Sequence, residues 1–89
     1  MTQMFIKKAS DEEIAQTKSW GTWSKENSTF DWFYDEKETC YILEGIAEVT
    51  DKEGNSISFG QGDLVCFQKG LSCTWKITSP IRKKYRFGD

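Results

Sequence analysis

With 89 residues, the chain is long enough for one small domain and lies near the lower size at which a single core stabilises a fold unaided. Its 14 acidic and 12 basic residues are interspersed, which argues against nucleic acid or an anionic membrane as a partner, because both need a concentrated basic surface. Apolar residues make up 37% of the chain and aromatic residues 15%, so a few large rings must supply much of the burial.

The cysteine and histidine content narrows the possible chemistry. There is no histidine, and the three cysteines (Cys40, Cys66 and Cys73) form no CxxC pair, so a zinc site of the usual Cys/His spacing is excluded. The first residues contain no apolar leader segment, and no apolar run approaches the roughly 20 residues that span a bilayer. We therefore expect a cytoplasmic protein with reduced thiols.

The first predicted element is a short helix. Ser10 is followed three residues later by Glu13, which is the pattern of a capping box, and the apolar pair Ile14 and Ala15 comes directly after it. This pattern predicts a helix over about residues 11–18.

The rest of the chain, about residues 20–88, has the pattern of an all-β domain. Turn residues recur every 8–12 positions, and the turn at 51–55 contains Gly54, which supplies the positive φ that a hairpin needs. These signals predict one domain over residues 1–89, a β-sandwich or barrel. Its strands are expected at 29–34, 39–50, 56–59, 64–67, 71–78 and 81–87.

Side-chain alternation assigns faces to the longest predicted strands. In 39–50, Gly45 predicts a bulge or bend. Simple alternation puts Glu38, Cys40 and Ile42 on one face and Tyr41, Leu43, Ala47 and Val49 on the other. In 81–87, alternation gives a basic row that we expect to be a solvated sheet edge, with anion binding as the alternative reading. The row consists of Arg82, Lys84 and Arg86, opposite Ile81, Lys83, Tyr85 and Phe87.

Two motifs framed by glycines carry a resemblance to a known family. ETCYILEG places six residues between Glu38 and Gly45, and GDLVCFQKG spans 62–70. Together they resemble the two cupin motifs, over about residues 18–88. More narrowly, the chain is similar to the small single-domain cupins grouped with the cupin domain of (S)-ureidoglycine aminohydrolase, which include ethanolamine-utilisation accessory cupins. The resemblance implies a cupin-type double-stranded β-helix, or jelly-roll barrel, with the short helix outside.

The chain departs from the cupin motifs at the metal-binding histidines. The two histidines of the first motif fall at 31 and 33 or at 32 and 34, depending on the spacer, and that of the second falls at Cys73. Only Glu38 is retained among the four metal-contacting positions. A mixed site of Asp31, Glu38, Cys40 and Cys73 is conceivable but is not a usual zinc or iron set. We expect no metal and no cofactor.

Aromatic residues at the histidine positions predict a different pocket. Without the histidines, the metal-binding pocket becomes an apolar pocket lined by aromatic rings with a few polar groups, which is typical of small-ligand sites. We expect this pocket to be lined by Trp32, Tyr34, Glu38, Cys40, Cys73 and Trp75, while Trp20 and Trp23 seal the barrel's end. The simpler alternative is that the rings and cysteines only fill the core.

Two functions fit this reading. The first is a metal-free cupin that binds a small polar or planar metabolite in the aromatic pocket. The second is a small-metabolite enzyme, a lyase, isomerase or hydrolase of ureide- or sugar-type substrates, with Glu38 as its catalytic acid/base. A homodimer formed through the face of Tyr41 and Leu43 is a further expectation.

Overall fold

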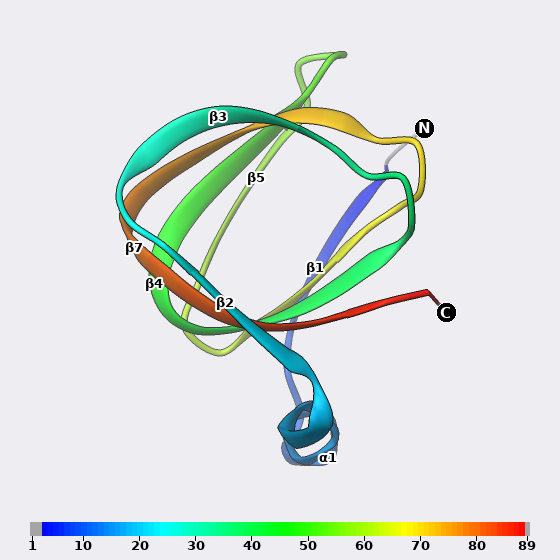
Figure 1. Ribbon diagram of the computed structural model, residues 1–89, viewed down its shortest axis with the longest axis vertical. Coiled ribbons are helices and arrows are strands. Elements are labelled where there is room, and N and C mark those ends of the chain that lie inside the picture. The colour runs from blue at the N-terminus through cyan, green and yellow to red at the C-terminus, as the bar shows by residue number, and fades with distance from the viewer. Residues whose placement is uncertain (1–2, 89) are drawn as a thin grey trace.

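The computed structural model describes residues 3–88 and shows an antiparallel barrel whose strands curve around one interior, with a short helix outside at one end (Figure 1). The sheet order is β1-β6-β4-β7-β2, while β3 pairs with β7 and β5 with β4. The cupin-type all-β fold predicted from the sequence is confirmed. The elements are β1 (Met4–Lys8), α1 (Asp11–Gln16), η1 (Thr17–Ser19), β2 (Gly21–Lys25), β3 (Ser28–Phe33), β4 (Glu38–Asp51), β5 (Ser56–Gly60), β6 (Asp63–Phe67) and β7 (Ser72–Phe87).

The helix begins with the capping box that the sequence indicates. The Ser10 hydroxyl accepts from the Glu13 backbone N–H at 3.2 Å, and the Glu13 carboxylate accepts from the Ser10 backbone N–H at 2.9 Å. These two bonds satisfy backbone donors that the first helical turn leaves without partners. The α-helix ends at Gln16, two residues earlier than expected, and continues as the 3₁₀ turn η1.

Two strands lie outside the predicted set, and two predicted strands are one. β1 pairs with β6, and β2 pairs with β7. Both are five-residue strands with mostly exposed side chains, so they lack the apolar alternation that marks a strand in a sequence. The expected strands 71–78 and 81–87 form the single strand β7, which continues through Pro80.

Gly45 explains why a proline can sit inside β7. Gly45 has φ +97°, and the register between β4 and β7 shifts around it, so the expected bulge is present. Pro80 faces this irregularity, where its missing N–H costs little. The bulge also reverses which side chains point inward, so simple alternation was right for Glu38, Cys40 and Ile42 but wrong for Ala47 and Val49. The buried residues are Glu38, Cys40 and Ile42 before it and Ala47, Val49 and Asp51 after it.

The basic row of β7 does not lie at a sheet edge. β7 is flanked by β4 and β2, so the expectation of an edge is wrong. Arg82 and Arg86 are exposed on the outer face, whereas Lys83, which points inward, is buried. Within residues 3–88, no helix is long and apolar enough to cross a membrane.

Candidate functional site

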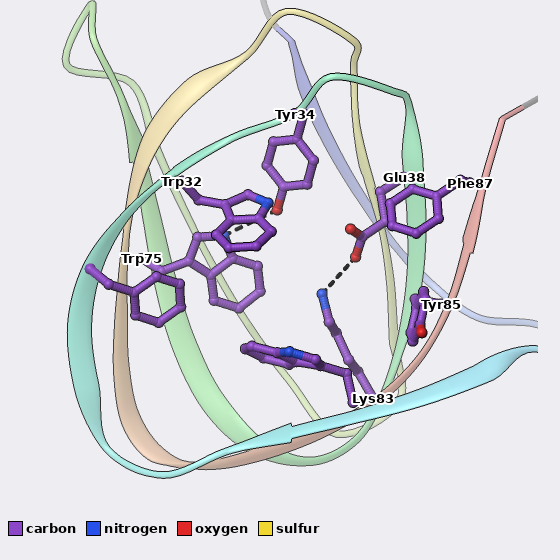
Figure 2. Close-up of a pocket in the computed structure, with 9 residues that line it drawn as sticks. Trp32, Tyr34, Glu38, Trp75, Lys83, Tyr85 and Phe87 are labelled. Carbon is purple, nitrogen blue, oxygen red and sulfur yellow. Dashed lines mark hydrogen bonds and ion pairs between the residues drawn. The ribbon is translucent and has the colours of Figure 1, made fainter.

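One end of the barrel interior holds a cavity of about 160 Å³ walled mainly by aromatic rings (Figure 2). Four strands contribute to it, and β7 supplies the largest share because its inward positions run along the cavity wall. The sequence-distant segments meet here because β2, β3 and β4 all pair with β7. The lining residues are Trp23, Phe30, Trp32, Tyr34, Glu38, Trp75, Lys83, Tyr85 and Phe87.

A buried ion pair lies in this cavity. Lys83 Nζ donates to Glu38 Oε2 at 2.6 Å, and Figure 2 shows the two side chains pointing toward one another from β7 and β4. Only 6% of the Lys83 side chain and 5% of the Glu38 side chain are exposed. Because each charge loses its hydration on burial, either charge alone would be strongly destabilising at this position, and the pair offsets that penalty.

Cys40 is the third member of this polar cluster. Its Sγ–H donates to Glu38 Oε2 at 2.8 Å, and Lys83 Nζ donates to the same sulfur at 3.4 Å. Burial raises the pKa of the Cys40 thiol well above its ordinary value, so the sulfur is a neutral thiol at neutral pH. Burial opposes the charge on Lys83, but the negative charge of Glu38 and the hydrogen bonds from Lys83 to Glu38 and Cys40 outweigh it and raise the pKa of Lys83.

Two indole rings hold the lysine ammonium from its sides. Lys83 Nζ lies 4.8 Å from the ring centroid of Trp23 and 4.9 Å from that of Trp75. Such cation–π contacts reach about 2 kcal/mol when the cation is desolvated. Trp23 occupies this position because it lies directly opposite Lys83 in the pairing of β2 with β7.

Tyr34 adds a hydroxyl group to the cavity wall. Its oxygen accepts from Trp75 Nε1 at 3.1 Å, and its ring stacks on Phe67 with centroids 4.8 Å apart. Burial raises the pKa of Tyr34 far above its ordinary value, so the hydroxyl keeps its proton. In the part of the chain that the structure describes, the Tyr34 O–H has no acceptor and Glu38 Oε1 has no donor.

Four of the six residues expected in the pocket line the cavity: Trp32, Tyr34, Glu38 and Trp75. Cys40 lies behind the wall in contact with Glu38, and Cys73 is buried elsewhere, where its Sγ–H donates to the Trp32 carbonyl at 3.6 Å. Cys73 is therefore not a wall residue, because it lies one inward position beyond Trp75 along β7.

Lys83 and Trp23 are the main residues that sequence reasoning missed. Trp23 was expected to seal the barrel's end but lines the cavity instead. The sequence did contain a signal for Lys83, because it lies on the same face of the strand as the apolar residues Ile81 and Tyr85 and not on the face of the basic row. Phe30, Tyr85 and Phe87 were also missed as wall residues.

The structure decides between the two alignments of the missing histidines. Positions 32 and 34 face the cavity, whereas Asp31 and Phe33 are exposed on the other side of β3. Asp31 accepts from the Thr74 hydroxyl at 2.9 Å and cannot join Glu38. Among residues 3–88, no three His, Cys, Asp or Glu side chains are arranged to hold a metal ion, and the expectation of a metal-free site stays a prediction.

The antiparallel barrel, the bulge at Gly45 and the cavity built around Glu38 define a small cupin. The sequence comparison gives the family directly. The chain belongs to the EutQ-like cupin domain family, whose sequence model matches residues 12–85.

Solved structures agree with this assignment. The chain is 46% identical to a DUF861 family protein from Thermotoga maritima, with a TM-score of 0.92, and the match covers 96% of this chain and 99% of that one. It is 25% identical to a DUF861 family protein of unknown function from Pseudomonas syringae, with a TM-score of 0.69, over 76% of this chain and 29% of that one.

The likeness to EutQ itself is structural. The EutQ protein of Clostridium difficile is 24% identical, with a TM-score of 0.69, over 75% of this chain and 52% of that one. This chain therefore matches about half of that protein's length. Comparison with proteins of curated function gives no match. None of these findings names ureidoglycine aminohydrolase, so that narrower resemblance stays a prediction.

Proposed function

We propose that this protein is a metal-free cupin that binds a small polar or planar metabolite in the aromatic cavity. The observation that carries the proposal is the cavity of about 160 Å³, with ring walls and the Glu38–Lys83 pair inside. An apolar cavity of roughly 150 Å³ is large enough for a benzene-sized molecule. Aromatic walls with a few fixed polar groups are typical of small-ligand sites.

The charge arrangement supports the absence of a metal. The ammonium group of Lys83 already occupies Glu38 Oε2 at 2.6 Å. A divalent cation bound to the same carboxylate would lie beside this positive charge, which the two surrounding indole rings hold in place. Lys83 thus supplies the cation that the carboxylate needs.

The protonation states of the cluster favour binding over covalent catalysis. A lysine that forms a Schiff base needs a lowered pKa, whereas that of Lys83 is raised. A cysteine nucleophile needs a thiolate, whereas burial raises the pKa of Cys40. The enzyme alternative therefore rests on Glu38 alone, as acid or base through its remaining oxygen.

We also propose that the protein acts in the cytoplasm. All three cysteines are free thiols, and two of them, Cys40 and Cys73, are buried. Free thiols persist where glutathione and thioredoxin keep the compartment reduced.

A thermal-shift screen of a metabolite collection in chelator-treated buffer tests the proposal. We expect at least one small ring compound to raise the unfolding temperature without being turned over. Trp32→Ala removes a wall residue that is 49% exposed and should weaken binding, whereas Phe33→Ala, at a neighbouring position that is 57% exposed and faces away, should not. Turnover that Glu38→Gln abolishes would favour the enzyme alternative instead.

A further inference from the structure

The cavity carries no net charge, which limits what it can bind. Glu38 and Lys83 are the charged residues in its wall, and they neutralise each other at 2.6 Å. An anionic ligand attracted by Lys83 would lie beside Glu38, and a cationic ligand would lie beside Lys83. Since any charged ligand would also lose its hydration, the site favours an uncharged one.

The ion pair leaves one acceptor and one donor next to each other. Glu38 Oε2 receives hydrogen bonds from Lys83 and Cys40, and Oε1 has no partner within residues 3–88. An ammonium group has three N–H donors, and Lys83 uses two of them, on Glu38 and Cys40. One ammonium N–H and Oε1 are therefore left without a hydrogen-bond partner within residues 3–88, on two groups that lie 2.6 Å apart.

The walls of the cavity favour a flat ligand. Phe30 and Trp75 stack with an interplanar angle of 11°, and the ring of Trp23 meets Trp75 edge to face. Aromatic rings prefer offset-stacked or edge-to-face partners, which a planar ring supplies. The volume of about 160 Å³ accommodates one ring rather than two.

We infer that the ligand is a single-ring, uncharged molecule with an amide edge, in which an N–H group and a C=O group are adjacent, as in a lactam. Its N–H donates to Glu38 Oε1, and its C=O accepts from the remaining N–H of Lys83. The ring itself lies in the cavity against Trp23, Phe30 and Trp75. This inference rests on the proposed function and adds the chemical class of the ligand.

Titration of the unmodified protein with matched ring compounds tests this inference. The probes are 2-pyridone, which carries the amide edge, N-methyl-2-pyridone, which lacks the N–H, and the charged rings benzoate and benzylammonium. Binding is followed through the indole N–H signals in NMR spectra. Trp75 and Trp23 line the cavity and report on it, while Trp20 is absent from the wall and stacks with Arg86, so it serves as the internal control.

We expect 2-pyridone to shift the Trp75 and Trp23 signals but not that of Trp20. N-methyl-2-pyridone should bind at least about tenfold more weakly, because Glu38 Oε1 would be covered without a hydrogen bond. Benzoate and benzylammonium should both bind more weakly than N-methyl-2-pyridone. Binding of the methylated or charged rings as tight as that of 2-pyridone would overturn the inferred class and leave the proposed function intact. If no ring shifts the cavity signals, the inferred class is overturned, and the metabolite screen decides separately on the proposed function.

Discussion

Lys83 Nζ and Glu38 Oε2 lie 2.6 Å apart inside the barrel, although 45 positions separate the two residues in the chain. They meet because β4 and β7 are antiparallel neighbours, with Lys83 opposite Ile42 and Glu38 opposite Phe87. The side chains of the pair are only 5–6% exposed, so water screens it less than it screens a surface pair. Its charges therefore influence the stability of the fold and, under the proposed function, the choice of ligand.

Replacing either residue of this pair alone should destabilise the fold. Lys83→Met or Glu38→Gln leaves a buried polar partner uncompensated, and we expect each to lower the free energy of unfolding by about 3–5 kcal/mol. The double variant should be less destabilised than the sum of the two, because no charge remains buried. Urea unfolding of the four proteins measures the coupling.

A second ion pair in the same sheet provides the control. Arg82 Nη2 and Glu44 Oε1 are also 2.6 Å apart, but their side chains are 49% and 61% exposed. Arg82→Met and Glu44→Gln should each change stability by less than about 1 kcal/mol. Equal losses of stability at the two pairs would contradict the claim that burial makes the Glu38–Lys83 pair important for the fold.

The fold should lose stability in alkaline solution. Burial raises the pKa of Cys40 and of Tyr34, and burial together with the nearby negative charge of Asp31 raises the pKa of Cys73 to about 11. The folded state therefore keeps protons that the unfolded state releases above about pH 8.5 for thiols and about pH 10 for tyrosine. Because the folded state binds more protons in this window, stability falls as pH rises through it.

Urea unfolding at pH 7, 8, 9 and 10 measures this dependence. Each group that keeps its proton when folded contributes a slope of about −1.4 kcal/mol per pH unit above its unfolded pKa. We expect Cys40→Ala to flatten the decline between pH 9 and 10, whatever its effect at pH 7. A slope identical to that of the unsubstituted chain would show that Cys40 does not hold a proton in this way.

The three thiols should differ in reactivity. Cys40 and Cys73 are buried, while Cys66 is partly exposed on β6. We expect iodoacetamide to alkylate Cys66 in the native protein at pH 8 and the other two only after unfolding. Peptide mass spectrometry identifies the labelled site. Labelling of Cys40 at a rate close to that of Cys66 would mean that the cavity wall opens readily.

Gly45 should be the glycine least tolerant of substitution. It has φ +97°, and a Cβ there would overlap the backbone carbonyl of Pro80. We expect Gly45→Ala to cost about 3 kcal/mol or more. Gly54 has a similar φ of +89° but open space around it, so Gly54→Ala should cost about 1 kcal/mol. Similar losses of stability at both positions would show that the positive φ alone causes the effect and that the contact with Pro80 adds nothing.

Much of the fold could be predicted from local patterns. The capping box at Ser10, the bulge at Gly45 and the hairpin turn at Gly54 each follow from the residues themselves. β1 and β2 could not be predicted in this way, because short exposed strands are specified by their partners β6 and β7 rather than by their own alternation.

The site was predictable only in part. Tyr34, Glu38 and Trp75 stand at or beside the cupin motif positions, so the resemblance located them. Lys83 was missed because lysine is rarely buried without a partner, and its partner Glu38 could be identified only from the pairing of β4 with β7. Side-chain pairs formed across a barrel depend on register, which a single sequence does not specify where bulges interrupt it.

The central claim, that the aromatic cavity binds a small molecule, is tested most directly by a crystal structure of the protein with the best compound from the thermal-shift screen. We expect the compound inside the cavity, against the rings of Trp23 and Trp75 and in contact with the Glu38–Lys83 pair. A compound bound only on the outer face of the barrel, with the cavity unchanged, would contradict the claim.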